Sequence, residues 1–231
     1  MSVIGKILKW VFIVLIVLVI AIVASGRTYL FKAVANTYLK GRSGPSISEY
    51  KIFSNNLVAS DSVQEWPLAY AYNRNKLSAE QLSMMDSYKT IAYLVIKNDS
   101  LLFEQYWDGY SDSSHTNSFS MGKTIVSILV GIAIDENKIK SVDQPIGDFL
   151  PEFAKGSNAK VTIKHLLTMS SGINFDENYA NPLAYPAAAY YGEDLKELTY
   201  KYKVTEEPGK VWNYLSGNTE LLAFIVAKAC G

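Results

Sequence analysis

The sequence predicts an α+β fold in which an antiparallel sheet packs against a cluster of helices, preceded by one N-terminal transmembrane helix. Residues 10–26 form an uncharged apolar run, and residues 91–97 and 101–107 are two strand-like segments joined by a short polar turn. Residues 124–134 form a second apolar run of helical length. Strand and helix segments of this kind bury their apolar faces against one another around one core.

The N-terminal run is the first predicted element. Residues 10–26 carry no charge and lie between Lys6 and Lys9 on one side and Arg27 and Lys32 on the other. At about 1.5 Å per residue this run spans roughly 25 Å, and the apolar pair before Lys9 extends it towards a hydrocarbon core of about 30 Å. We therefore expect an uncleaved, single-pass anchor in the cell membrane.

A cleaved signal peptide is the alternative for this segment, because Val23-Ala24-Ser25 offers small residues of the kind found at a cleavage site. In that case the protein is secreted. Lys6 and Lys9 are consistent with a cytoplasmic N-terminus. In both cases the remainder of the chain is expected to be extracytoplasmic, in the periplasm or outside the cell.

Composition excludes several classes of function. The charges balance at a formal net charge of +0, so nothing indicates a nucleic-acid partner. No phosphate-binding glycine motif is present, and His115 and His165 lie far apart in the sequence, so neither a cofactor nor a metal is implied. Cys230 is the single cysteine, which excludes an intrachain disulfide.

Ser-x-x-Lys is the motif with chemical content, and it occurs three times, at Ser48/Lys51, Ser120/Lys123 and Ser157/Lys160. Only the second pair is followed by an apolar run. The other two pairs lie beside turn-forming residues, where both side chains are expected to be solvated. From position alone, a helix-capping serine followed by a surface lysine remains an equal explanation for the second pair.

The functional interpretation of Ser120 and Lys123 rests on helix geometry. Residues three apart share one face of a helix, and a serine hydroxyl needs a neighbouring base to act as a nucleophile at neutral pH. The following run is apolar on nearly every side, so we expect a buried helix and a partly desolvated lysine that favours its neutral form. The start of the helix also offers backbone N–H groups to an oxyanion at Ser120.

Five segments in order resemble the β-lactamase-like, penicillin-binding serine hydrolases, in particular the branch with class C β-lactamases, esterases and 6-aminohexanoate-oligomer hydrolases. They are the strand pair within 91–107, Phe119-Ser-Met-Gly-Lys123 with its helix, Ser141-Val-Asp-Gln-Pro-Ile-Gly-Asp-Phe-Leu-Pro151, Val161-Thr-Ile-Lys-His-Leu-Leu-Thr-Met-Ser-Ser-Gly172, and Pro208-Gly-Lys-Val-Trp-Asn-Tyr-Leu-Ser-Gly-Asn-Thr219. The resemblance implies a β-lactamase/transpeptidase-like fold with the nucleophile helix buried between the sheet and the other helices.

The resemblance also implies roles for individual residues: Ser120 as nucleophile, Lys123 as base and a tyrosine that relays the proton. The family writes that third element as Tyr-x-Asn, which Tyr179-Ala180-Asn181 matches literally. We favour Tyr214, because a Pro-Gly pair precedes it and a helix follows it, as in the family. Its third position is Ser216, which departs from asparagine and is expected to orient the substrate through its hydroxyl.

The family's third motif, a Lys-Thr-Gly or His-x-Gly strand, does not follow Tyr214. We therefore expect an incomplete C-terminus, and divide the chain into residues 1–27 as anchor or signal, 28–90 as lead-in, and 91–231 as the hydrolase domain. The expected function is a serine hydrolase acting through an acyl-enzyme on a small-molecule or peptide substrate. A β-lactam, a peptidoglycan peptide, an ester and a linear amide all remain open. The alternative is a membrane-tethered, non-catalytic homologue that binds cell-wall peptides or a partner protein.

Overall fold

The computed structural model describes residues 3–59, 62 and 64–231. Small parts of the predicted anchor (residues 1 and 2) and of the lead-in region (residues 60, 61 and 63) thus lie outside the described residues. The chain divides into two compact units, the first formed by residues 1–46 and 118–231 and the second by residues 47–117. The predicted strand pair lies in the second unit, together with part of the lead-in region.

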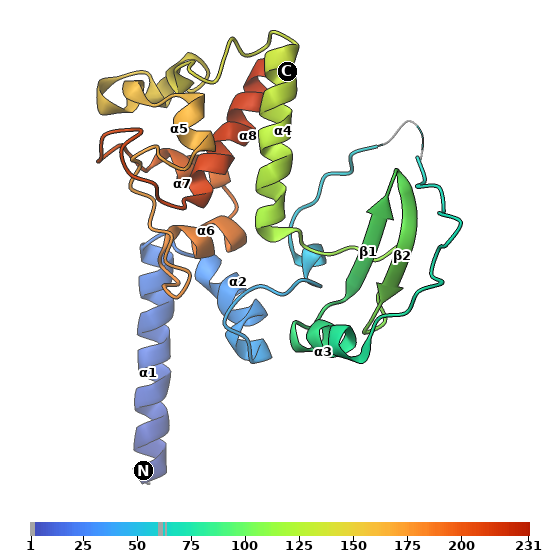
Figure 1. Cartoon of the computed structure of the whole chain (residues 1–231). Coiled ribbons are helices and arrows are strands. Elements are labelled where there is room, and N and C mark those ends of the chain that lie inside the picture. The colour runs from blue at the N-terminus through green and yellow to red at the C-terminus, as the bar shows by residue number, and fades with distance from the viewer. Residues whose placement is uncertain (1–2, 60–61, 63) are drawn as a thin grey trace. The chain divides into compact units, whose positions relative to one another are not determined.

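The second unit contains one helix and one hairpin (Figure 1). Helix α3 spans Ala79–Ser87, and Ser78 caps it: its hydroxyl accepts from the Gln81 N–H, while the Gln81 side chain accepts from the Ser78 N–H. This capping box satisfies two backbone donors that the first helical turn leaves open. Strands β1 (Ala92–Lys97) and β2 (Ser100–Tyr106) pair antiparallel, with an irregularity in register after Val95.

The hairpin turn explains the tight β1–β2 connection. Asn98 and Asp99 both adopt positive φ, at 52° and 54°. Asparagine and aspartate tolerate this left-handed conformation better than other non-glycine residues, and two such residues in succession match the twist of a two-residue hairpin. The strand pair predicted from the sequence is therefore confirmed to within one residue at each end.

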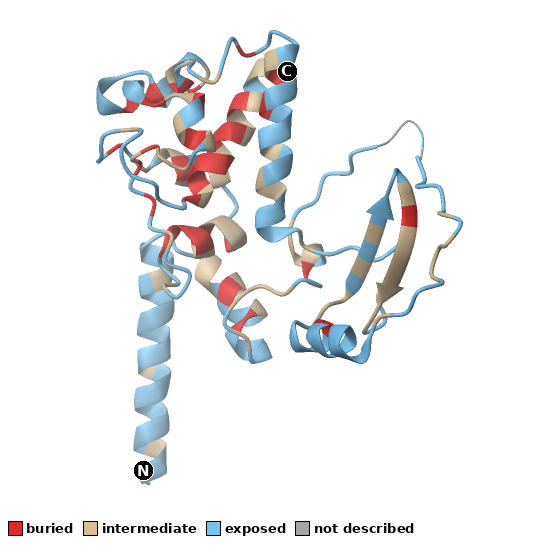
Figure 2. Ribbon diagram, in the orientation of Figure 1, coloured by how far each residue is buried: buried red, intermediate tan, exposed pale blue. Residues whose placement is uncertain are grey.

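The first unit is helical and begins with α1 (Val3–Ala24), none of whose residues is buried. Its 22 residues correspond to a length of about 33 Å, which is enough to cross a hydrocarbon core of about 30 Å. Figure 2 shows α1 exposed along its length, whereas burial concentrates on helices later in the chain. By length and composition α1 is able to span a membrane.

The remaining helices of the first unit enclose its apolar core. They are α2 (Tyr29–Asn36), α4 (Gly122–Asp135), α5 (Ile163–Leu167), α6 (Tyr185–Tyr191), α7 (Leu195–Tyr200) and α8 (Ser216–Cys230). Short 3-10 turns connect them at 38–40, 119–121, 146–148, 151–153 and 156–160, and a further turn at 50–52 belongs to the second unit. Phe153, Val161, Leu166, Leu221 and Ile225 are almost fully buried in this core.

Helix α4 differs from its sequence-based prediction. We expected it to be buried on nearly every face, but only the side that bears Val130 and Ala133 is buried, where α4 packs against α8. Ile125, Ile128 and Ile132 are 59%, 53% and 47% exposed. An apolar sequence states what a helix is able to bury, and the tertiary structure decides which faces receive a neighbour. The prediction of an all-round buried helix was wrong for this structure.

Candidate active site

Ser120 lies in a tight turn directly before α4. The 3-10 turn Phe119–Met121 leads into the helix, and Phe119 adopts a φ of 47°. A positive φ is uncommon for a bulky residue, and strained backbone of this kind clusters at functional sites. The turn presents the Ser120 side chain at the exposed start of α4, while the Met121 and Gly122 N–H groups donate within the turn to the carbonyls of Ser118 and Phe119.

Three side chains predicted from the sequence meet at this turn. The Lys123 Nζ lies 3.3 Å from the Ser120 Oγ, and the Tyr214 hydroxyl donates to the same Oγ at 2.7 Å. The Lys123 Nζ also lies 5.2 Å from the centre of the Tyr214 ring, within range of a cation–π contact. Both groups that could move a proton are therefore in contact with the nucleophile candidate.

The other two Ser-x-x-Lys pairs have different surroundings. The Ser157 hydroxyl donates to the Val204 carbonyl at 3.2 Å, and Lys160 forms an ion pair with Glu207 at 3.2 Å. Lys51 lies over the ring of Tyr50, at 5.8 Å from its centre. Of the three pairs, the structure brings a tyrosine hydroxyl onto the serine at Ser120.

Tyr214 owes its position to the extended segment that precedes α8. The Asn213 N–H donates to the Met169 carbonyl at 2.8 Å, and Leu215 has extended backbone angles of −134° and 108°. The Leu215 side chain is buried, so the flanking Tyr214 and Ser216 side chains point to the opposite face, as alternation along an extended chain requires. The segment thus presents both predicted side chains on one side.

The loop before α6 supplies a residue that sequence reasoning missed. The Glu177 carboxylate accepts from the Ser216 N–H at 2.8 Å, from the Ser216 hydroxyl at 2.5 Å and from the Tyr179 hydroxyl at 2.7 Å. Tyr179 also lies 3.3 Å from the Ser216 Oγ. No spacing in the sequence links Glu177 to Ser216, which follows 39 residues later. Tyr179, the rival candidate for the relay, is placed beside Ser216.

Burial and the nearby carboxylate affect Tyr179. Partial burial of its phenol, together with the hydrogen bond to Glu177 and the negative charge of that residue, raises the pKa of Tyr179 to about 12. The hydrogen bond to Ser216 acts in the opposite direction but is outweighed. At neutral pH the Tyr179 hydroxyl therefore keeps its proton and is able to donate to Glu177.

A cavity of about 370 Å³ adjoins this group of side chains. Its lining includes Glu177 and Tyr214, together with backbone and side chains of the 172–175 and 205–206 segments. Cavities of this size are of the order that small ligands occupy. Among the described residues, no group of three His, Cys, Asp or Glu side chains is arranged to hold a metal ion.

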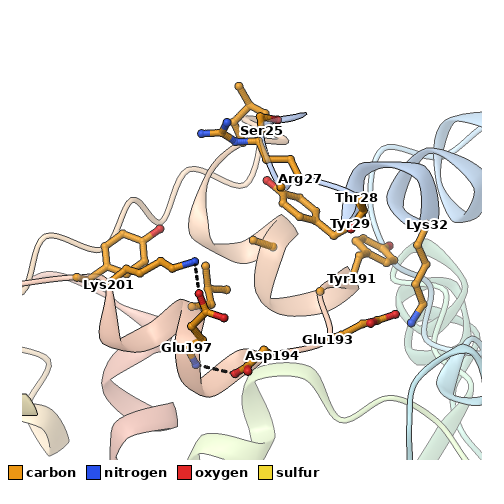
Figure 3. Close-up of a pocket in the computed structure, with 16 residues that line it drawn as sticks. Ser25, Arg27, Thr28, Tyr29, Lys32, Tyr191, Glu193, Asp194, Glu197 and Lys201 are labelled. Carbon is orange, nitrogen blue, oxygen red and sulfur yellow. Dashed lines mark hydrogen bonds and ion pairs between the residues drawn. The ribbon is translucent and has the colours of Figure 1, made fainter. Parts of the chain in front are cut away.

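A second cavity, of about 480 Å³, is lined by residues after α1 and by α6 and α7 (Figure 3). Its charged groups have structural partners: the Asp194 carboxylate caps α7 by accepting from the Glu197 N–H at 2.7 Å, and Lys201 pairs with Glu197 at 3.0 Å. None of Ser120, Lys123 and Tyr214 lines it. This cavity is separate from the candidate catalytic group.

Glu220, on α8, carries the titration with the clearest physical cause near Lys123. Burial raises the pKa of the Glu220 carboxyl above its usual value of 4.5, and the positive charge of Lys123 lowers it by a smaller amount. The folded chain therefore binds this proton more tightly than the unfolded chain does. The resulting stabilisation is complete below pH 4.5 and is lost as the pH rises through the raised pKa.

Glu220→Gln is accordingly expected to stabilise the protein at pH 7 relative to the wild type, because the amide avoids placing a charge in a partly buried site. The advantage is expected to shrink towards pH 4, where the wild-type carboxyl is protonated as well. Unfolding midpoints of the two proteins in urea between pH 4 and pH 8 measure the difference. A wild type that gains stability over the variant as the pH rises would contradict this assignment.

Comparison with known proteins supports the fold. A 6-aminohexanoate-dimer hydrolase of Paenarthrobacter ureafaciens is 26% identical over 152 residues, which cover 62% of this chain and 38% of that protein. A Bacillus subtilis (strain 168) protein provisionally named penicillin-binding protein PbpX is 27% identical over 178 residues, 68% of this chain and 42% of that protein. The chain thus spans about two fifths of the length of these curated relatives.

A solved structure shows the same relationship. The Bacillus anthracis protein provisionally named 6-aminohexanoate-dimer hydrolase superposes with a TM-score of 0.59 at 25% identity, over 73% of this chain and 49% of that one. The beta-lactamase family profile matches residues 80–231, about two thirds of the chain. These matches confirm the predicted β-lactamase/transpeptidase-like fold class, and the chain belongs to the beta-lactamase family.

Proposed function

We propose that the chain carries the nucleophilic centre of a serine hydrolase that works through an acyl-enzyme. The observation that carries this proposal is the double contact at the Ser120 Oγ, with the Tyr214 hydroxyl at 2.7 Å and the Lys123 Nζ at 3.3 Å. Both distances are within reach of proton transfer. A serine that only capped a helix would not need two such groups on its side chain.

In this mechanism the Ser120 Oγ attacks the carbonyl carbon of the substrate while its proton passes to Lys123, directly or through the Tyr214 hydroxyl. The carbonyl oxygen takes the negative charge of the tetrahedral intermediate. When that intermediate collapses, the bond to the leaving group breaks and Tyr214 returns the proton to that group. Water then attacks the acyl-serine along the same path in reverse and releases the acid, so atoms and protons balance.

The substrates are carbonyl compounds of low molecular weight or short peptides. Support comes from the names of the relatives, one a hydrolase of the 6-aminohexanoate dimer and one a penicillin-binding protein. The cavity of about 370 Å³ at Glu177 and Tyr214 is in keeping with such a size. We further propose that α1 anchors the protein in the membrane and that the hydrolase part is extracytoplasmic, as Lys6 and Lys9 before the apolar run suggest.

Covalent labelling tests this function. The full chain in detergent is incubated separately with a fluorophosphonate and with a penicillin, and its intact mass is recorded over several hours. We expect one adduct, located by peptide mapping at Ser120, with the peptides that carry Ser48 and Ser157 unmodified. A folded chain that forms no adduct with either probe would contradict the catalytic proposal and favour a non-catalytic homologue.

A further inference from the structure

The hydrogen-bond polarity of Ser216 bears on which substrates the proposed site prefers. The Ser216 side chain lies on the Tyr214 side of the extended segment, because the intervening Leu215 faces the core. A polar group so close to the candidate relay is in a position to contact the part of the substrate beside the reacting carbonyl. What it offers that substrate depends on where its single proton points.

Glu177 determines the direction of that proton. A carboxylate has acceptor sites only, so the 2.5 Å contact between the Ser216 Oγ and the Glu177 Oε1 requires the serine to donate. The second carboxylate oxygen accepts from the Ser216 N–H at 2.8 Å, which fixes the geometry from two sides. Hydrogen bonds to an ionised acceptor are shorter and about twice as strong as those between neutral groups.

Tyr179 reinforces this arrangement from the other side. Its hydroxyl donates to the same Glu177 oxygen at 2.7 Å, and its pKa of about 12 keeps it protonated at neutral pH. The Ser216 proton is therefore engaged, and the Oγ has its lone pairs left for any further partner. An asparagine at this position would present an N–H₂ donor, whereas Ser216 held by Glu177 presents an acceptor.

We propose that Ser216 and Glu177 act together as a specificity determinant that accepts a hydrogen bond from a substrate N–H, so that the site prefers substrates with a secondary amide beside the reacting carbonyl. Glu177 is a positioning residue in this arrangement, since it acts through Ser216. The inference rests on the proposed function, because it concerns the substrate of the Ser120 centre.

The test uses two activated esters that differ in a single N–H group. The p-nitrophenyl esters of N-acetylglycine and N-acetylsarcosine carry the same leaving group, and the second has a methyl group in place of the amide hydrogen. The rate of Ser120 acylation is measured by intact mass for the full chain. We expect the N–H ester to react about tenfold faster, the scale of one hydrogen bond of about 1.4 kcal/mol.

Variants separate this hydrogen bond from the steric effect of the methyl group. Ser216→Ala removes the acceptor, and Glu177→Gln supplies an amide N–H that lets the Ser216 hydroxyl turn its proton outwards. Both are expected to bring the rate ratio of the two esters to within about twofold. Tyr179→Phe is the matched control, because it removes a hydrogen bond to Glu177 but leaves the Ser216 proton engaged, and it is expected to keep the preference.

The outcomes distinguish the two proposals. If both esters acylate Ser120 at the same rate in the wild type, or if Ser216→Ala keeps the tenfold preference, the specificity inference is overturned and the hydrolase proposal stands. If neither ester acylates the folded chain, the hydrolase proposal itself fails, and the inference fails with it. Because the wild-type ratio is informative alone, the test does not depend on the folding of any variant.

Discussion

Ser120→Ala is expected to abolish covalent labelling by fluorophosphonate and by activated esters. The loss of a catalytic serine lowers turnover by roughly 10⁶-fold in enzymes of this kind, so no adduct should be detectable over hours. Intact mass spectrometry of the variant and the wild type, side by side, measures the effect. Ser157→Ala is the matched control, because it removes the serine of another Ser-x-x-Lys pair and should leave the adduct in place.

The same assay separates the two tyrosine candidates. Tyr214→Phe removes the hydroxyl that donates to the Ser120 Oγ at 2.7 Å, and a lost proton relay costs about 10²–10⁴ in rate. Tyr179→Phe removes a hydroxyl that contacts Glu177 and Ser216, so its effect on the acylation rate should be much smaller. The reverse order would assign the relay to Tyr179 and refute the role that we propose for Tyr214.

Gly172→Ala is expected to destabilise the fold strongly, although it adds only one methyl group. Gly172 has a φ of +69°, and a Cβ at this position would lie 2.3 Å from the Glu206 carbonyl oxygen. Its own carbonyl accepts from the N–H groups of Thr205 and Glu206, so neither segment is able to retreat without losing hydrogen bonds. The backbone penalty and the clash together amount to about 3 kcal/mol.

A loss of this size lowers the midpoint of thermal unfolding by roughly 10 °C for a chain of this length. Circular dichroism of the variant in detergent measures it. Gly131→Ala is the control, because a Cβ there meets nothing within 4 Å and the residue lies inside α4. Alanine favours a helix interior over glycine by about 1 kcal/mol, so that variant should be slightly more stable than the wild type. Equal midpoints for the two variants would show that the close approach at Gly172 is not rigid.

Local features of this protein were predictable from the sequence because each depends on neighbours within a few positions. The Ser78 cap needs the residue three places later, the β1–β2 turn needs Asn98 and Asp99, and α1 needs an unbroken apolar run. The contact between Ser120 and Lys123 belongs to the same class, since one helical turn brings them together whatever the rest of the chain does.

Contacts between distant segments were decided by the tertiary structure. Tyr214 reaches Ser120 across 94 residues and Glu177 reaches Ser216 across 39, and no sequence period encodes either separation. The exposed side of α4 has the same origin, because an apolar pattern fixes which residues favour burial but not how many neighbours arrive. The sequence by itself thus determined the helices, the hairpin and the Ser120–Lys123 pair through short-range geometry, while packing alone decided which tyrosine joins that pair and which carboxylate holds Ser216.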